Sequence, residues 1–322
     1  MTNDVTPFSP PQLIEGVAPA SKLGIIKVEG ADAASFLQGQ LTQDFVLLKP
    51  NQARLAAFCS AKGRMQASFV GFKRSKDDGD SERESEILLV CSRDVLPATL
   101  KRLSMFVMRA KAKLTDATGD FSIFGLAGQA AQGRGLDTET PWAAAQIGAS
   151  AMIALYPAST VPRALWIGPK AEAAPDGAIL TEALWDWSEV QSGIATIAAK
   201  TVDAFVPQML NYESVGGVNF KKGCYPGQEV VARSQFRGTL KRRAYIVHSE
   251  SPMETGDKVF ASTDAEQSCG TVAQAAASPT GGFNAIVSMQ VAAAAAGGLT
   301  LSSAVGAKLE LLALPYALLD DI

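Results

Sequence analysis

Through the first half of the chain, apolar residues occur in short runs that are bounded by glycine and polar residues, and this pattern predicts β-strands. Helical spacing is found at two places between these runs. Asp32 can cap the first helix and Gly39 can end it, while Pro97 fits the first turn of the second. The expected strands are 23–28, 53–59, 65–73, 87–91, 105–114, 122–126 and 163–167, and the expected helices are 32–38 and 94–103.

A clearer helix is predicted at 180–192, where apolar residues recur on one helical face and Gly193 follows as a stop signal. The members of this face are Leu180, Ala183, Leu184, Trp187 and Val190. Trp187 is therefore expected in the core. Trp185 points about 160° away from Trp187, at 100° per residue, so we expect it to lie outside the core.

The last third of the chain changes to short strands separated by turn residues. The expected strands are 244–248, 258–261, 270–274, 285–289 and 308–313. Together they predict a small all-β barrel or sandwich.

Composition limits the class of protein. A chain of 322 residues with 47% hydrophobic content can form two or three domains. Its net charge of -3 argues against a general attraction to nucleic acid, and the absence of a signal-peptide pattern or an 18-residue apolar span predicts a cytoplasmic protein with no place in a membrane. The acidic run at 75–86 is expected to be a solvated loop.

The cysteines and the histidine exclude several kinds of site. Cys59, Cys91, Cys224 and Cys269 form no Cys-x-x-Cys pair, which argues against a disulfide framework, a zinc ribbon and an iron-sulfur cluster held wholly by this chain. We therefore predict no metal site. The single histidine, His248, lies in an expected strand, so Ser-His-Asp hydrolysis is excluded.

The segment 221–229 concentrates most of the candidate chemistry. Cys224 lies between two glycines and after two lysines, just before a helix predicted at 228–234 in which Glu229 and Arg233 can pair. A helix N-terminus and nearby positive charge both stabilise a thiolate. The pattern is typical of a reactive cysteine, and equally of a small buried side chain on a structural turn.

Positive charge is also concentrated here. Between residues 221 and 243 there are seven basic residues and one acid, Glu229. Such a run is often only a solvated face. Because a candidate thiolate lies in the same segment, we favour a pocket that receives carboxylates or phosphates.

Several sequence blocks carry a resemblance to a known family. They are KGCYPGQEVVAR at 222–233 with FRG at 236–238, PQ at 207–208, GG at 216–217, FK at 220–221, GAD at 30–32, FLQGQLT at 36–42 and PY at 315–316. In these blocks the chain resembles the YgfZ family, folate-binding proteins similar to the glycine cleavage T protein, an aminomethyltransferase.

The resemblance implies an α+β fold in which two interlocked α+β domains and a C-terminal all-β barrel form a ring around a central hole. The domain boundaries that it implies are 1–50 plus 118–237 for the first domain, 51–117 for the second and 238–322 for the barrel.

The resemblance also implies a cofactor, tetrahydrofolate or a derivative, and a set of site residues. Cys224, Lys222 and Glu229 are the candidate chemical residues. The candidate folate-binding residues are Trp185, Gln40, Gln228, Arg233 and Arg237. The polyglutamate tail of folate is the candidate ligand of the basic segment. At the position of the family's N-terminal folate-contacting tryptophan this chain has Leu23, and the loss of that aromatic surface predicts weaker stacking.

Two functions remain open. In the first, the chain is a folate-binding accessory factor that supports the assembly or repair of iron-sulfur clusters in client enzymes, such as those that thiolate tRNA. In the second, it is a folate-dependent aminomethyl or one-carbon transferase, a reaction that needs a carboxylate at the folate nitrogen. Gln66 and Ala67 occupy the positions of the acids in the T-protein pattern, and neither can ionise. The first function is therefore preferred.

Overall fold

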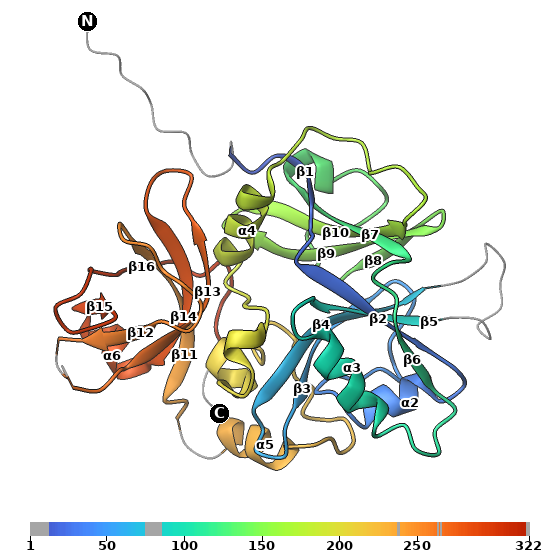
Figure 1. Ribbon diagram of the computed structural model, residues 1–322, viewed down its shortest axis with the longest axis horizontal. Helices are drawn as coiled ribbons and strands as arrows, with labels where there is room; N and C mark the ends of the chain where they lie inside the picture. The colour runs from blue at the N-terminus through green and yellow to red at the C-terminus, as the bar shows by residue number, and fades with distance from the viewer. Residues whose placement is uncertain (1–12, 75–85, 237–238, 263, 265, 320–322) are drawn as a thin grey trace, which may run out of the picture.

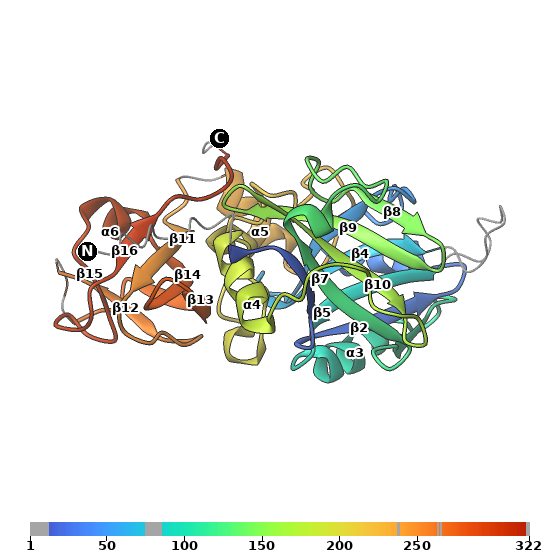
Figure 2. The ribbon, with the colours of Figure 1, turned by 90° about the horizontal axis from the view of Figure 1, so that it is seen from above.

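The computed structural model of the protein describes residues 13–74, 86–236, 239–262, 264 and 266–319. The described chain is a mixed α and β structure with three antiparallel sheets (Figure 1). Two of the sheets lie at one end of the molecule and the third lies at the other, with helix α4 (Glu182–Gln191) between them (Figure 2).

The first sheet has the order β1-β7-β10-β9-β8. Its strands are β1 (Gly16–Pro19), β7 (Phe121–Ala127), β10 (Val161–Pro169), β9 (Ser150–Ala158) and β8 (Ala144–Ile147). Strands β1, β8 and β9 were not predicted. β8 and β9 lie in or next to an alanine-rich stretch, where period-two alternation is weak because alanine fits buried and exposed positions alike.

The second sheet has the order β3-β4-β5-β2-β6. Its strands are β3 (Ala53–Cys59), β4 (Met65–Arg74), β5 (Glu86–Ser92), β2 (Leu23–Glu29) and β6 (Lys113–Asp116). Helices α2 (Ala33–Gln38) and α3 (Leu96–Ser104) contribute to a core on one side of this sheet, where Phe36, Leu37 and Leu103 join Ile26 and Leu89. The opposite side packs against the first sheet through a shared apolar core.

Three local predictions in this region need correction. Only the last two residues of the strand predicted at 105–114 belong to a strand, β6. The residues before them form turns in which Met105 and Met108 are exposed. Asp32 does not cap α2 with its side chain, because its Oδ2 accepts a hydrogen bond from the backbone N–H of Lys111 instead (2.7 Å). The predicted acidic loop lies outside the described residues except for Glu86, which is buried in β5 and pairs with Arg74 (2.6 Å).

The C-terminal sheet has the order β15-β12-β13-β14-β11-β16. It curls into a half-barrel (Figure 1), where the sequence predicted a small all-β barrel or sandwich. Its strands are β15 (Leu299–Leu301), β12 (Lys258–Ala261), β13 (Gly270–Ala277), β14 (Phe283–Gln290), β11 (Arg242–Ser249) and β16 (Glu310–Leu312). The sequence missed β15 and the short helix α6 (Val291–Ala296). The remaining helices are α5 (Gln228–Phe236) and the 3-10 turns η2 (Gly128–Ala131), η3 (Ala199–Thr201) and η4 (Pro207–Leu210).

Helix α4 is buried on two sides, which corrects the prediction for Trp185. Trp187 donates a hydrogen bond from Nε1 to Oδ1 of Asn284 in β14 (2.9 Å). Trp185, only 2% exposed, packs on the first sheet, where a Cβ at Gly125 would overlap its indole ring. The prediction assumed one buried face, as on a helix at the protein surface. A helix between two sheets buries two faces, so residues outside the apolar stripe are buried as well. Ala183, predicted for the core face, is exposed.

The domain boundaries remain a prediction. β1 pairs with β7 of the first sheet, while β2, only a few residues later, pairs with β5 and β6 of the second. The chain therefore begins both sheets before residue 30. Within the described residues, no helix has the length and apolar character needed to cross a membrane.

Candidate functional site

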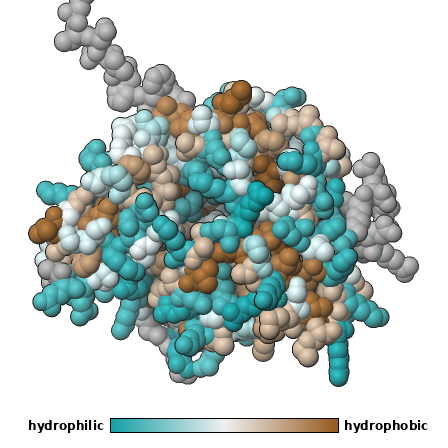
Figure 3. Space-filling view, viewed as in Figure 1, coloured by the Kyte–Doolittle hydropathy of each residue, from teal (hydrophilic) through white to brown (hydrophobic). Residues whose placement is uncertain are grey.

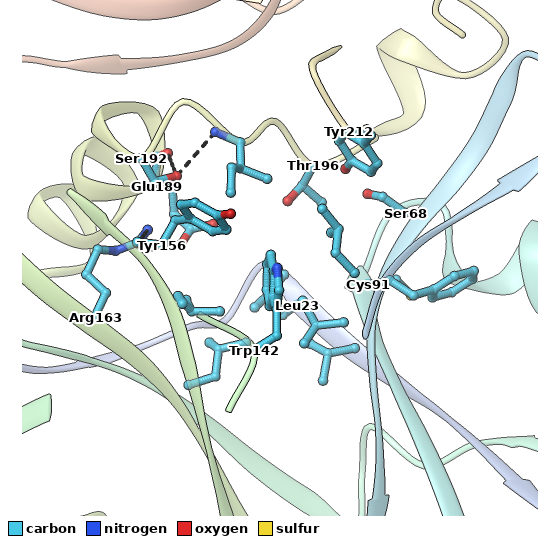
Figure 4. A pocket seen from close by; sticks show the side chains of 17 residues that line it. Leu23, Ser68, Cys91, Trp142, Tyr156, Arg163, Glu189, Ser192, Thr196 and Tyr212 are labelled. Atoms are coloured by element: carbon cyan, nitrogen blue, oxygen red, sulfur yellow. Dashed lines mark hydrogen bonds and ion pairs between the residues drawn. The ribbon is translucent and has the colours of Figure 1, made fainter. Parts of the chain in front are cut away.

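A small chamber lies where the first sheet, the second sheet and α4 meet (Figure 4). Its volume is about 60 Å³. The side chains that line it come from all three: Leu23 and Cys91 from the second sheet, Tyr156 and Arg163 from the first, and Glu189 from α4. Trp142, in the loop before β8, adds a second aromatic ring beside Tyr156, with 5.8 Å between ring centroids.

Glu189 is the carboxylate of this chamber, and it is held by a buried cation. Its Oε1 forms an ion pair with Nη2 of Arg163, whose side chain is 2% exposed. Burial lowers the pKa of Arg163 to about 9. The guanidinium also stacks over the ring of Trp185, 4.4 Å from its centroid. Glu189 lines the chamber, and its Oε2 makes no hydrogen bond with the described residues, so this oxygen can accept one from a ligand.

The chamber continues into a mouth of about 180 Å³ between α4 and the C-terminal sheet. Leu23, Glu189 and Thr196 line both spaces, and Trp185 and Gln274 line the mouth. Trp185 therefore reaches a cavity although it is buried. The sequence indicated Trp185 by the family resemblance and by its departure from the apolar stripe of the helix, and neither indication required it to be buried.

A second feature, the loop of residues 221–227 that we call the thiol loop, lies at the N-terminus of α5. Gly227 has φ +79°, and a Cβ there would overlap the carbonyl of Ser60 and the backbone of Gly63. Gly63 itself has φ +70° and lies against Val230 of α5. The thiol loop is thus pressed against the β3–β4 turn, and both glycines are needed for this close approach.

Lys222 fastens the thiol loop to the end of α2. Its side chain is buried, and Nζ donates hydrogen bonds to the carbonyls of Gln38 (2.5 Å) and Leu41 (2.7 Å). The ammonium also lies 4.5 Å from the ring centroid of Tyr225. Burial lowers the pKa of Lys222 to about 8, although Asp44 and Cys224 act in the opposite direction. These contacts make Lys222 a structural clamp between two sequence blocks that lie far apart in the chain.

Cys224 is the exposed thiol of this protein, while Cys59, Cys91 and Cys269 are buried. Burial raises the pKa of both Cys59 and Cys91 to about 12, and it also raises the pKa of Cys269. Cys59 ends β3, Cys91 lies in β5 and Cys269 precedes β13, so all three thiols lie in or beside apolar strands.

We expect Cys224 to react first with iodoacetamide at pH 8. A thiol with a pKa near 12 is deprotonated in about one molecule in 10,000 at this pH, and burial also blocks access. Peptide mapping by mass spectrometry after short exposure should find the label at Cys224. The Cys224→Ser variant, kept folded, should take up almost no label. Early labelling of Cys59 or Cys91 in the folded protein would contradict this.

The structure keeps the chamber and the thiol loop apart. Leu55 lines the chamber and Cys59 lies at the end of the same strand, beside the turn that carries the thiol loop. Four strand residues span roughly 13 Å. Of the predicted folate-binding residues only Trp185 lines the chamber or its mouth. Gln40, Gln228 and Arg233 line neither, and Arg237 lies outside the described residues.

The basic segment is not one anion-binding pocket. Lys222 is buried and donates its hydrogen bonds to backbone carbonyls. Arg243 pairs with Glu213 (2.9 Å), and Arg242 donates to the carbonyl of Cys269 (2.9 Å). Glu229 and Arg233 form the predicted pair on α5, and both side chains are largely exposed. Most of this charge has structural partners, which the sequence could not show.

The acidic positions of the transferase pattern are also accounted for. Gln66 is buried, and its Nε2 donates to Asp203 at 3.3 and 3.5 Å. Ala67 is part of the core behind the second sheet. Neither lines the chamber, whose carboxylate comes from α4 instead.

Comparisons with known proteins agree with the resemblance in the sequence. The tRNA-modifying protein YgfZ of Edwardsiella ictaluri is 32% identical over 300 residues, which cover 86% of each chain. That of Photobacterium profundum is 33% identical over 236 residues, 71% of this chain and 68% of the relative. No protein-family model matches the chain.

Among solved structures, the glycine cleavage system aminomethyltransferase T of Bartonella henselae has a similar fold, with a TM-score of 0.67. The match covers 95% of this chain and 88% of the other at 15% identity. At this identity the likeness concerns the fold alone.

Proposed function

The chain belongs to the YgfZ family, and from this premise we propose that it is a folate-binding accessory factor that supports iron-sulfur enzymes which modify tRNA. Relatives that cover most of the chain are named tRNA-modifying proteins. The fold is similar to that of an aminomethyltransferase of the glycine cleavage system.

The observation that carries the folate proposal is Glu189 in the chamber. The pterin ring of tetrahydrofolate presents two adjacent donors, N3–H and the 2-amino group, which together match one carboxylate. Glu189 offers such a carboxylate, which is paired with Arg163, and the rings of Tyr156 and Trp142 line the same chamber. These rings supply aromatic surface that Leu23 does not, so the chamber can hold a flat heterocycle despite the change at that position.

The size of the chamber sets a condition on binding. Sites for drug-sized ligands usually enclose about 300–1,000 Å³, whereas the chamber encloses about 60 Å³ and its mouth about 180 Å³. The ring must therefore occupy parts of both spaces, with Glu189 at their junction, and the rest of the ligand must lie elsewhere.

We assign the iron-sulfur part of the function to the thiol loop. Its thiol is exposed and lies away from the chamber, so a client protein can reach it while folate is bound. Three chemistries are open to such a thiolate: iron ligation, transfer of sulfur as a persulfide, and acceptance of a one-carbon unit. We do not propose aminomethyl transfer for this chain, because Gln66 and Ala67 can neither ionise nor reach the chamber.

The test is a titration with tetrahydrofolate, followed by tryptophan fluorescence. We expect binding in the low-micromolar range or weaker, with quenching that falls in Trp185→Phe. Glu189→Gln should weaken binding by about 10- to 100-fold, since hydrogen bonds to charged groups contribute roughly 1.5–3 kcal/mol.

Glu229→Gln, the same exchange on the exposed face of α5, is the matched control and should leave the affinity unchanged. Because Glu189→Gln leaves Arg163 without its partner, its folding is checked by circular dichroism, and Trp185→Phe probes the site with all charges in place. Wild-type affinity in both Glu189→Gln and Trp185→Phe would place folate outside this chamber.

A further inference from the structure

A second, larger cavity lies on the other side of Trp142. This outer cleft encloses about 480 Å³ between the residues that lead into β3 and the loop that leads into β8. Its polar lining includes Gln43, Asn51, Gln52, Arg54 and Asp137. Trp142 lines both the outer cleft and the chamber, so the two cavities lie next to each other at this residue.

Trp142 is held by its backbone and by its indole. Its N–H donates to the carbonyl of Ala154 (2.9 Å), its carbonyl accepts from Ala53 (2.7 Å), and Nε1 donates to the carbonyl of Val215 (2.8 Å). Its φ is +68°, in the left-handed region that a bulky residue rarely adopts. A strained residue that lines two neighbouring cavities is a candidate for a role in a ligand's path.

Arg54 is the cation of the outer cleft. It is half-buried, and its guanidinium donates to the carbonyl of Asp44 (3.4 Å) and to Oε1 of Gln52 (3.1 Å). Burial lowers the pKa of Arg54, while the charge of Asp44 raises it. Among the described residues no carboxylate lies close enough to form an ion pair with it, and Nη1 makes no hydrogen bond. A guanidinium in this state is suited to a carboxylate or phosphate of a ligand.

Asp137 does not compete for Arg54. Its Oδ1 accepts from the backbone N–H of Glu139 (3.0 Å) and its Oδ2 from the hydroxyl of Thr140 (2.5 Å). These hydrogen bonds lower the pKa of Asp137 and turn its carboxylate toward its own loop. The cleft therefore offers one available cation together with amide groups.

The mouth on the other side of the chamber has the opposite character. Three acids line it, Glu182, Asp186 and Glu189, against one lysine, Lys22, which already pairs with Asp186 (2.6 Å). An anionic group would be repelled there. The mouth is therefore unsuited to an anion. The outer cleft suits one, as does a third cavity that shares Leu23 with the chamber and is lined by Arg93 and Lys170.

The shape of folate also indicates that its benzoyl-glutamate arm leaves the chamber on the side away from α4. The donor edge of the pterin and the arm at C6, which leads to the benzoyl-glutamate, are at opposite ends of the ring system. With the donor edge on Glu189, the arm points away from α4. Figure 4 shows Glu189 entering the chamber from the α4 side and Trp142 entering it from a different side.

We propose that the outer cleft binds the glutamate end of the folate whose ring occupies the chamber and part of its mouth, with Arg54 as the partner of its carboxylates. This inference rests on the proposed folate function and adds a site to it. Because Trp142 lines both cavities, the tail passes beside this residue. The amides of Gln52 and Asn51 can bind the peptide-like link between benzoyl and glutamate.

The experiment compares two ligands by isothermal titration calorimetry: tetrahydrofolate, and 6-methyltetrahydropterin, which has the same ring but no tail. Arg54→Ala should lower the affinity for tetrahydrofolate by about 10-fold or more. It should leave the affinity for 6-methyltetrahydropterin within about twofold. Arg54→Lys should retain part of the affinity, and Arg54→Glu should lose more than Arg54→Ala. Arg102→Ala, at an exposed arginine on α3, is the matched control.

Equal losses for the two ligands in Arg54→Ala, or no loss for either, would overturn the tail site while leaving folate binding in place. A wild-type protein that binds neither ligand would overturn the folate proposal together with this one. The two failures are therefore distinguishable.

Discussion

Replacing Lys222 with methionine should destabilise the folded protein by about 2–5 kcal/mol. The substitution keeps the length of the side chain but removes the ammonium that satisfies the carbonyls of Gln38 and Leu41. Each buried acceptor left without a partner costs roughly 1–3 kcal/mol. Urea unfolding, followed by far-ultraviolet circular dichroism, measures the change.

Lys221→Met is the matched control, because this neighbouring lysine is exposed and its side chain has no described partner. Its effect should stay within about 0.5 kcal/mol. If Lys222→Met unfolds at the same urea concentration as Lys221→Met, then Lys222 is not a clamp and its role must be sought in chemistry.

The shifted pKa of Lys222 also makes the free energy of unfolding depend on pH. Burial lowers the pKa of Lys222 in the folded state to about 8, from an ordinary value of 10.5. Between these values the unfolded chain binds more protons than the folded protein, so stability rises with pH. The stability of the wild-type protein relative to Lys222→Met should therefore increase from pH 8 toward pH 10.5.

Cys224→Ser should abolish function while leaving the fold intact. The thiol is exposed and takes part in none of the contacts that hold the loop, so its loss should change stability by less than about 0.5 kcal/mol. A hydroxyl neither ligates iron as a thiolate does nor carries a persulfide. In cells that lack the native protein, thiolated tRNA nucleosides measured by mass spectrometry should not recover, although the purified variant binds tetrahydrofolate like wild type.

Two neighbours provide the controls for this experiment. Lys221→Ala and Glu229→Ala change exposed side chains around the thiol without removing it. Full recovery with Cys224→Ser, combined with failure of Glu229→Ala, would show that the loop is a docking element and that the proposed thiol chemistry is wrong.

The fold could be predicted where the pattern and its cause are local. Strands β3 and β4 were found because two apolar runs flank a turn, and Gly63 has the positive φ that such a turn requires. The helix after the thiol loop and its pair of Glu229 and Arg233 depend on spacing alone. Trp185 shows the limit, since the sequence does not tell that α4 lies between two sheets.

The candidate site was predicted less completely, because its members come together only in the folded chain. Cys224 was identified from its neighbours in sequence, and its exposure agrees with that choice. Glu189 looked like any acid on an amphipathic helix until Arg163, from β10, was found beside it. Arg54 gave no signal at all, because its position in a cleft depends on a loop that follows it by about 80 residues. The basic segment gave a misleading signal, since three of its basic residues are bound by groups that lie outside it: the carboxylate of Glu213 and the carbonyls of Gln38, Leu41 and Cys269.

The order in which the chain enters its sheets has a consequence for synthesis on the ribosome. Strand β1 leaves the ribosome early, but its partner β7 follows roughly 110 residues later, since Gly16 pairs with Ala127. At 5–20 residues per second, β1 waits on the order of 5–20 s for its partner to be made. The whole second sheet is synthesised in that interval and can fold first. Strand β1 can then pair with β7 next to a second sheet that is already complete, before β8, β9 and β10 of its own sheet have been made.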